Sequence, residues 1–437
     1  MTLPLWFDPT EILIGGTWQS TPRTLPVETP STGEEIAQIA RGQARDIDAA
    51  VSAAQAALEG EWGQLSAAER GRLLLAMSRR VTERAVELAT LEAMDVGKPL
   101  AQARADVTAL ARYLEFYGGA ADKVMGQTIP FQQGYTAYSL REPHGVTAHI
   151  VPWNYPMQII GRSVGAALAM GNAAVLKPAE EASLTALAFA RIADEVGMPP
   201  GAINIVPGLG EEAGAALSAH PGVNHISFTG SVAVGQKIQE AAAANVVPVT
   251  LELGGKSPQL VFGDADLGRA LPFLVNAGIQ NAGQTCSASS RILVQRSIYD
   301  DVLDQMAARY RDLVAGPAMA DRDLGPLISA RQKEIVAGYL RLTSDLPIAA
   351  QGQIAPDAPE GGHYVAPTLI GGGVMLLILC CVTLVKTGQD RIPAGSGNPA
   401  LTATQLRQPG LRNAPNAAGN PRVELTNIQT KTTGTAF

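Results

Sequence analysis

Residues 147–177 read TAHIVPWNYPMQIIGRSVGAALAMGNAAVLK, and this stretch decides the fold. The run Thr147–Val151 is apolar and β-rich, which predicts a strand. Pro156 is placed to open a helix that runs to about Met170, and Ala173–Lys177 predicts a second strand. A strand, a helix of this length and a second strand form the unit from which parallel sheets are built.

The same alternation continues toward the C-terminus. A helix is expected over about 182–196, and Gly197 with the Pro199-Pro200 pair ends it. Further strands are expected over residues 203–206, 225–229, 249–253, 259–262 and 292–295. We therefore expect an α/β fold with a mostly parallel sheet covered by helices on both faces. Ligands of such sheets bind beyond the carboxyl ends of the strands, and we expect every motif described below to lie at such an end or in the loop after it.

The part of the chain that precedes these strands is predicted to be helical. Ser66 followed by Glu69 is the pattern of a capping box, which opens a helix with Met77 turned inward. Gly97 and Pro99 are expected to end this helical stretch.

Composition narrows the class of protein. The 437 residues carry 33 Lys and Arg against 40 Asp and Glu, a net charge of −7, and 46% of them are hydrophobic. This indicates a globular chain with two or three domains, and nucleic acid is not an expected partner because clustered Lys and Arg are lacking. Three cysteines do not make a disulfide framework, and Met1–Asp8 does not resemble a signal peptide, so a cytoplasmic location is expected. The apolar run Val374–Val385 is shorter than the roughly 20 residues of a membrane span, so no membrane partner is expected.

Two motifs suggest a dinucleotide site. Lys177 and Glu180 follow a predicted strand, where an ammonium and a carboxylate could both reach a ribose, and the carboxylate would favour NAD over NADP. The alternative is a solvated loop pair. Gly230 and Ser231 precede Gly235 at the start of a helix, where backbone amides and a hydroxyl could meet phosphate; alone, this string could be a simple turn.

Gly210 follows another strand, in Gly208-Leu-Gly210. It is included among the expected cofactor-binding residues, although a plain strand-to-helix turn would look the same.

Three other strings contain residues suited to catalysis. Asn154 lies between a strand and a helix, where its amide could stabilise an oxyanion, and Trp153 could pack on a cofactor or fill core. Glu252 lies in an apolar strand, where loss of solvation would make it a general base, or where it could form a structural ion pair. Cys286 is flanked by small and polar residues and is a candidate nucleophile, the alternative being an inert buried thiol.

The order of these motifs resembles the aldehyde dehydrogenase superfamily. The strings are P-W-N-Y-P, K-P-A-E, F-T-G-S-x-x-x-G, L-E-L-G-G-K-S-P and G-Q-T-C, and the likeness runs from about residue 12 to about residue 370. The resemblance implies an NAD-binding domain with a Rossmann-type parallel sheet over 1–127 and 147–253. It further implies an oligomerisation arm over 128–146 and an α/β catalytic domain over 254–370.

By this resemblance Cys286 would attack the carbonyl carbon of a small-molecule aldehyde, while its own backbone N–H and Asn154 hold the oxyanion. Hydride transfer to NAD would leave a thioester, which water activated by Glu252 would hydrolyse to the carboxylic acid. The presence of Glu252 favours hydrolysis over transfer of the acyl group to coenzyme A or phosphate. Thr285 and Ser287 resemble the betaine- and amino-aldehyde branch.

The cofactor contacts are implied in the same way. Lys177 and Glu180 match the residues that contact the adenosine ribose, Gly230 and Ser231 match the pyrophosphate site, and Trp153 matches a residue near the cofactor. No metal is expected.

The chain departs from the family pattern after about residue 370. The E-E-I-F-G-P string, whose Glu contacts the nicotinamide ribose, and the strand that completes the family's homo-oligomer are both lacking. We therefore expect an incomplete catalytic domain, an arm without its partner strand, doubtful assembly and a disordered tail over 371–437. A truncation or frame change of the gene would account for this switch. Two alternatives follow: a catalytically inactive NAD-binding remnant, and an interaction protein, which the intact set Asn154, Glu252 and Cys286 disfavours.

Overall fold

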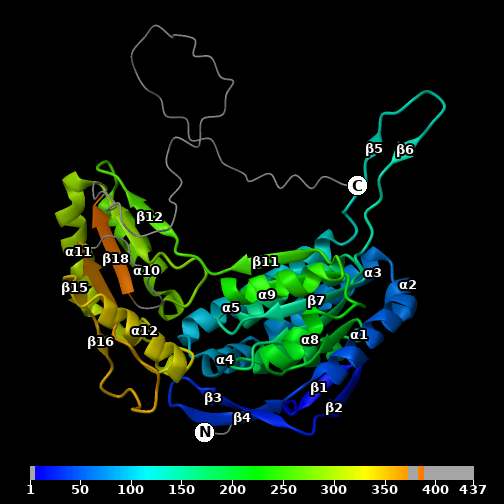
Figure 1. The fold of residues 1–437 in the computed structure, drawn as a ribbon, viewed down its shortest axis with the longest axis horizontal. Helices are drawn as coiled ribbons and strands as arrows, with labels where there is room; N and C mark the ends of the chain where they lie inside the picture. The colour runs from blue at the N-terminus through cyan, green and yellow to red at the C-terminus, as the bar shows by residue number, and fades with distance from the viewer. Residues whose placement is uncertain (1–4, 373–381, 388–437) are drawn as a thin grey trace. The chain divides into compact units, whose positions relative to one another are not determined.

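Two main β-sheets organise the part of the chain that the structure describes, residues 5–372 and 382–387 (Figure 1). The structure is a computed structural model, and these residues all belong to the unit Met1–Asp390. One sheet has seven strands in the order β11-β10-β7-β8-β9-β1-β2, and the other has five in the order β12-β13-β18-β17-β15.

The centre of the seven-stranded sheet is parallel. It consists of β7 (Val146–Val151), β8 (Ala173–Pro178), β9 (Ile203–Ile205), β10 (His225–Gly230) and β11 (Val249–Leu253). Each begins and ends within one residue of the strand expected from the sequence. The predicted α/β class is therefore confirmed, and the short β-rich runs were a sufficient signal because parallel strands are buried on both faces.

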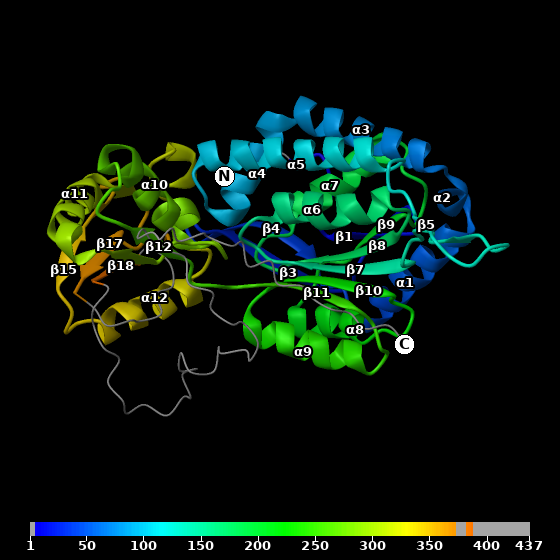
Figure 2. The same cartoon turned by 90° about the horizontal axis from the view of Figure 1, so that it is seen from above.

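Helices cover both faces of this sheet, as predicted. Figure 2 shows α6 (Pro156–Ala169) and α7 (Leu184–Glu195) on one side and α8 (Ala215–Ser218) with α9 (Val232–Ala243) on the other. α1 (Ala44–Glu59) packs against β8 and β9. The remaining helices before β7 are α2 (Glu61–Gln64), α3 (Ala67–Glu83), α4 (Ala85–Val96) and α5 (Leu100–Ala120).

The strand order creates a crevice between β7 and β10. The chain runs from β7 outward through β8 to β9, and then returns to place β10 on the opposite side of β7. At such a topological switch point the segments that follow the two strands diverge, which leaves room for a ligand at the carboxyl edge. Trp153 and Asn154 follow β7, and Ser231 follows β10, so the sheet brings these predicted site residues to one edge.

The prediction of a helical N-terminal part is wrong for its first segment. Residues 11–40 form β1 (Glu11–Ile14), β2 (Thr17–Ser20), β3 (Thr24–Thr29) and β4 (Glu34–Ala40). β1 pairs antiparallel with β9, with Leu13 opposite Ile205. This pairing covers the edge of the sheet and joins segments far apart in sequence, so local periodicity could not reveal it.

The start of α3 confirms the predicted capping box. Ser66 Oγ accepts from the backbone N–H of Glu69 at 3.3 Å, and Glu69 Oε2 accepts from the N–H of Ser66 at 2.8 Å. Met77 is buried, as predicted. Gly97, in the left-handed conformation, ends α4, and Pro99 precedes α5. The helical stretch is therefore interrupted at Gly97-Lys-Pro99 and continues as α5.

The five-stranded sheet includes one strand from the C-terminal tail that begins at residue 371. It consists of β12 (Pro258–Val261), β13 (Arg291–Val294), β15 (Ile348–Gln351), β17 (Thr368–Gly371) and β18 (Val382–Thr387). β18 lies between β13 and β17 and is parallel to both. Six residues of the tail that was expected to be disordered over 371–437 thus form a strand, which pairs with backbone groups of β13 and β17. For residues 373–381 and 388–437, which lie outside the described part, the prediction stands untested.

Smaller elements complete the described part. Helices α10 (Leu267–Ile279), α11 (Tyr299–Asp312) and α12 (Ala330–Leu342) accompany the five-stranded sheet, and β14 (Val314–Ala315) pairs with β16 (Gln353–Ile354). The hairpin of β5 (Thr128–Ile129) and β6 (Ala137–Tyr138) extends away from the seven-stranded sheet (Figure 1). It exposes the large apolar side chains of Ile129, Phe131, Tyr135 and Tyr138. That it serves as an oligomerisation arm remains a proposal. None of the helices that the structure describes is long and apolar enough to cross a membrane.

His149, in the middle of β7, provides a test of this packing. Its ring is buried, Nε2 lies 2.9 Å from Thr147 Oγ1, and burial lowers the pKa of His149 from 6.5 to about 3. Below pH 6.5 the unfolded chain binds a proton that the folded chain does not, so stability is lost as the pH falls from about 6.5 toward about 3. The free energy of unfolding of the native protein should therefore fall, relative to His149→Gln, by up to about 1.4 kcal/mol per pH unit in this window. Denaturant titrations at several pH values measure this difference, and parallel curves for the two proteins would contradict it.

Candidate active site

Cys286 lies exposed in a loop between the 3₁₀ turn Gln280–Gly283 and β13. The prediction that every motif follows the carboxyl end of a strand is wrong for this residue, because Cys286 precedes β13. The rule concerns ligands of a single parallel sheet, whereas this loop belongs to the second sheet and reaches the site from the amino end of its strand.

The turn before Cys286 has an unusual backbone. Asn281 (φ 48°), Ala282 (φ 55°) and Gly283 (φ 75°) all adopt the left-handed conformation. Two consecutive non-glycine residues of this kind persist only when their surroundings hold them. Here the Asn281 backbone N–H donates to Gln102 Oε1 at 2.9 Å, and Asn281 Nδ2 donates to the carbonyl oxygen of Asn154 at 3.1 Å. The strained turn thus fixes the Cys286 loop against the end of β7.

Gln284 is the main anchor of this loop, and sequence reasoning missed it. Its side chain is buried at 4% exposure. Nε2 donates to the carbonyl oxygens of Asn281 (3.1 Å) and Pro326 (3.4 Å), and Oε1 accepts from the N–H of Ile328 (3.0 Å). A polar residue two positions before Cys286 was the available signal, but two of its partners, Pro326 and Ile328, lie more than 40 positions away.

Gln284→Ala should loosen this loop. The truncation leaves buried backbone groups without partners, which costs about 1–3 kcal/mol for each unsatisfied group. We expect a lower free energy of unfolding and faster alkylation of Cys286 by iodoacetamide in native buffer. Gln239→Ala, at an exposed position on α9, is the matched control and should change neither quantity. Equal alkylation rates in the native protein and Gln284→Ala would show that the loop does not depend on this anchor.

Asn154 is held beside the same loop. Its Nδ2 donates one hydrogen bond, at 2.9 Å, to the carbonyl oxygen of Gln284. An amide nitrogen carries two hydrogens, so a second N–H is available to a reacting oxygen. The structure therefore brings Asn154 and Cys286, which are remote in sequence, to one site.

Glu252 lies on β11, and its side chain is exposed. The predicted loss of solvation around this carboxylate is therefore wrong. β11 is the edge strand of the seven-stranded sheet, and its residues alternate between partly buried and exposed. Glu252 pairs in register with Thr229 of β10 and lines the same cavity as Cys286.

Two cavities meet at Cys286. One, of about 500 Å³, includes Trp153, Gly230, Ser231 and Glu252 in its lining. The other, of about 200 Å³, includes residues of α6 and of the Cys286 loop in its lining. Four residues line both cavities: Asn154, Thr229, Thr285 and Cys286. The arrangement can therefore present two different ligands to one thiol.

Lys177 and Glu180 form an ion pair at the end of β8. Lys177 is buried at 2% exposure, and its Nζ lies 2.8 Å from Glu180 Oε2. Burial would raise the pKa of Glu180, but the charge and hydrogen bond of Lys177, helped by the N–H of Gly210, outweigh it and lower the pKa. The predicted ribose pair and Gly210 thus lie together, with the carboxylate ionised.

The predicted phosphate-binding residues at the turn between β10 and α9 lie in two different environments. Ser231 begins α9, where its Oγ accepts from the N–H of Val234 at 3.3 Å, and together with Gly230 it lines the larger cavity. Gly235 is buried instead, and a Cβ there would stand 2.7 Å from Leu253 Cδ2. A glycine is needed here because α9 packs closely on β11, and not because residue 235 lines a cavity.

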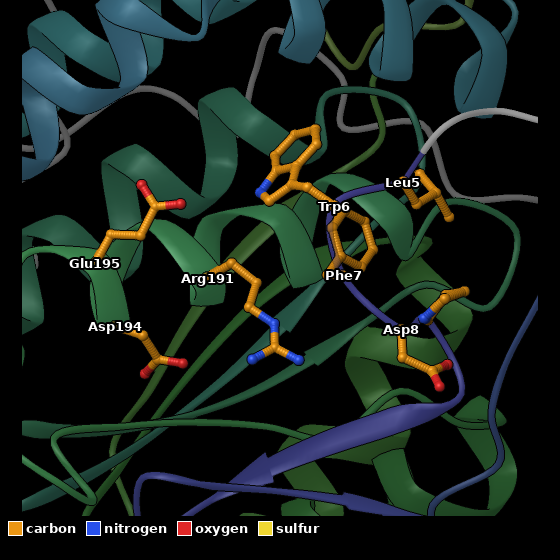
Figure 3. A pocket seen from close by; sticks show the side chains of 8 residues that line it. Leu5, Trp6, Phe7, Asp8, Arg191, Asp194 and Glu195 are labelled. Atoms are coloured by element: carbon orange, nitrogen blue, oxygen red, sulfur yellow. The ribbon is translucent and has the colours of Figure 1, made fainter.

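A different groove, of about 900 Å³, lies along residues 5–9 and the end of α7 (Figure 3). Its charged groups already have partners: Arg191 pairs with Glu11 at 3.0 Å, and Glu195 pairs with Arg80 and Arg84. None of the predicted site residues lines it. This groove is therefore separate from the cavities at Cys286.

The comparisons with known proteins identify the family of this chain. The profile described as "Aldehyde dehydrogenase family" matches residues 18–373, which include every residue named above at the two cavities. The chain belongs to the aldehyde dehydrogenase family. By family it is thus an oxidoreductase that acts on aldehydes with a pyridine nucleotide.

Relatives of this aldehyde dehydrogenase cover most of its length. It is 43% identical over 348 residues to hydroxyisobutyraldehyde dehydrogenase of Mycolicibacterium austroafricanum, which is 79% of this chain and 69% of that one. A crystal structure assigned as an aldehyde dehydrogenase of Burkholderia cenocepacia has a TM-score of 0.86 and 54% identity, over 87% of this chain and 82% of that one. Betaine aldehyde dehydrogenase of Staphylococcus aureus, solved as a point mutant with NAD⁺, has a TM-score of 0.85 and 33% identity, over 89% and 81%.

The larger cavity of this aldehyde dehydrogenase fits a dinucleotide. Gly254 faces open space, since no atom lies within 4 Å of the position that a Cβ would take. The N-terminus of α9 opens on this cavity through Gly230 and Ser231, where the helix dipole favours an anion. Within residues 5–372 and 382–387, no group of three or more His, Cys, Asp or Glu side chains is arranged to hold a metal ion.

Proposed function

We propose that this chain oxidises an aldehyde to a carboxylic acid with NAD, through a thioester on Cys286 that is hydrolysed by water activated by Glu252. The observation that carries the proposal is the meeting of two cavities at Cys286, with Asn154 in the lining of both and Glu252 in the lining of the larger.

The first steps involve Cys286 and Asn154. The thiolate Sγ adds to the carbonyl carbon, and the C=O electron pair moves to the oxygen. The free N–H of Asn154 and the backbone N–H of Cys286 are the donors that would stabilise this oxyanion. NAD held in the larger cavity, by Gly230 and Ser231 among others, would supply the acceptor for the hydride that leaves the carbon, and a thioester would remain on Cys286.

Glu252 would then act as a general base. Its carboxylate takes a proton from water as the water oxygen attacks the thioester carbon, and Sγ leaves as the thiolate. An exposed carboxylate on an edge strand is accessible to water, so burial is not needed for this role.

NAD rather than NADP is supported by the Lys177–Glu180 pair. The lowered pKa of Glu180 keeps its carboxylate negative at neutral pH, and a negative group beside the ribose disfavours a 2′-phosphate.

The direct test uses the purified full chain. NADH absorbance is followed with NAD or NADP and a short aldehyde, and nucleotide binding is measured separately by calorimetry. NADH formation with NAD supports the proposal. Nucleotide binding without turnover would instead support the catalytically inactive NAD-binding remnant.

A further inference from the structure

The smaller cavity at Cys286 is lined along one side by a single face of α6. Tyr155, Gln158, Ile159 and Arg162 all contribute to it. Their spacing of three, one and three positions places them on one stripe of a helix. This stripe begins at the residue next to Asn154 and ends about two turns farther along the helix, roughly 10 Å away at 1.5 Å per residue.

Arg162 is the one charged side chain among the residues that line this cavity. Its side chain is partly buried, and within the described part of the chain no carboxylate lies within the 4.0 Å of an ion pair. Its one recorded hydrogen bond runs from Nη2 to Thr229 Oγ1, at 3.5 Å. A guanidinium held in a partly buried cavity without a counter-charge favours an anionic ligand.

Tyr155 adds a second donor to the same cavity. Its side chain is 9% exposed, and its Oη has no partner that meets hydrogen-bond geometry among the described residues. Burial raises the pKa of Tyr155 to about 12, so the phenol stays protonated and can donate. The buried Lys98 Nζ lies 4.1 Å from the centre of the ring and is itself paired with Glu92 and Asp106. The ring therefore lies against the ammonium of a buried ion-pair network.

We propose that Arg162 binds a carboxylate, or a similar anionic group, at the far end of the aldehyde substrate. This inference rests on the proposed function and names its substrate class. The volume of about 200 Å³ lies below the range of drug-sized sites, which favours a short substrate with the aldehyde at Cys286. A quaternary ammonium aldehyde, the substrate class expected from Thr285 and Ser287, would bring its positive charge next to the positive guanidinium of Arg162, which disfavours binding.

A rival explanation assigns Arg162 to positioning Glu252. Arg162 contacts Thr229, and Thr229 is opposite Glu252 in the register of β10 and β11. If Arg162 acted in this way, its loss would slow the hydrolysis of every thioester, whatever the charge of the substrate. Substrate charge therefore separates the two explanations.

The first test needs no turnover. Iodoacetate and iodoacetamide both alkylate Cys286 by displacement of iodide by the thiolate, but only iodoacetate carries a carboxylate. The rates are followed on the peptide that contains Cys286 by mass spectrometry. We expect the ratio of the iodoacetate rate to the iodoacetamide rate to fall about 10-fold or more in Arg162→Gln. Arg79→Gln, at an exposed position on α3, should keep the ratio of the native protein. An unchanged ratio in Arg162→Gln, or equal slowing with both reagents, would overturn the proposal.

A measurement on the native protein covers the case in which Arg162→Gln does not fold. Butanoate should protect Cys286 from iodoacetamide at about 10-fold lower concentration than butanamide. Equal protection by the two compounds would overturn the proposal.

The second test uses turnover. The ratio of kcat/KM for 4-oxobutanoate to that for butanal should fall about 10- to 100-fold in Arg162→Gln, and betaine aldehyde should be a poorer substrate than 4-oxobutanoate for the native protein. A parallel loss with both aldehydes would overturn the proposal in favour of the positioning role. No NADH formation with any aldehyde would contradict the proposed function, while the alkylation ratio would still decide the role of Arg162.

Discussion

Replacing Cys286 with serine is expected to abolish NADH formation from every aldehyde tested. A hydroxyl at neutral pH is a far weaker nucleophile than a thiolate, and loss of a covalent nucleophile lowers kcat on the order of 10⁴-fold or more. The side chain is exposed and lines both cavities, so the substitution removes the thiol without disturbing a packed core. Absorbance at the NADH band with an excess of NAD and aldehyde measures the effect.

The controls for this experiment separate chemistry from folding. Cys286→Ser should bind NAD as the native protein does, because the Lys177–Glu180 pair and the α9 N-terminus are unchanged. Replacing Cys380 and Cys381 with serine removes the other two thiols of the chain and should leave turnover intact. Persistent NADH formation in Cys286→Ser would show that a different group performs the first step.

The sequence revealed the central sheet well because its signals are local. Parallel strands that are buried on both faces are short, apolar runs, and glycine or proline separates them from the helices. β1 and β18 escaped prediction for the opposite reason. Each is a strand by virtue of a partner far along the chain, Ile205 for Leu13 and Arg291 for Leu384, and no local pattern encodes that pairing.

The sequence predicted which residues belong to the candidate site, but not their exposure or their hydrogen-bond partners. Motif order identified Asn154, Glu252 and Cys286, yet the burial expected for Glu252 is wrong because β11 is an edge strand. The role of Gln284 depends on hydrogen bonds to residues 326 and 328, which sequence spacing cannot show.

The stripe on α6 presents the same difficulty. Arg162 lies at a helical spacing that would equally suit a core or a solvent face. Only the folded chain shows that this face borders the cavity at Cys286.

Glu252→Gln is expected to separate the two halves of the reaction. Glutamine keeps the size of the side chain but cannot take a proton from water, so formation of the thioester should survive while its hydrolysis slows by about 10²- to 10⁴-fold. Mixing enzyme with saturating NAD and aldehyde should therefore give a burst of NADH close to one equivalent, followed by a slow steady rate. Mass spectrometry of the peptide that contains Cys286 should show the acyl adduct.

The matched control for this variant is Glu240→Gln, at an exposed position on α9, which should turn over like the native protein. A burst that disappears together with the steady rate would contradict the assignment, because it would place Glu252 before the thioester, as the base that deprotonates Cys286. The exposed position of Glu252 bears on this choice. Water reaches the carboxylate directly in the cavity of about 500 Å³, whereas the thiol is held by a separate loop that Gln284 and Asn281 fix. Both groups line this cavity, and the burst is therefore the observation that distinguishes the two orders of events.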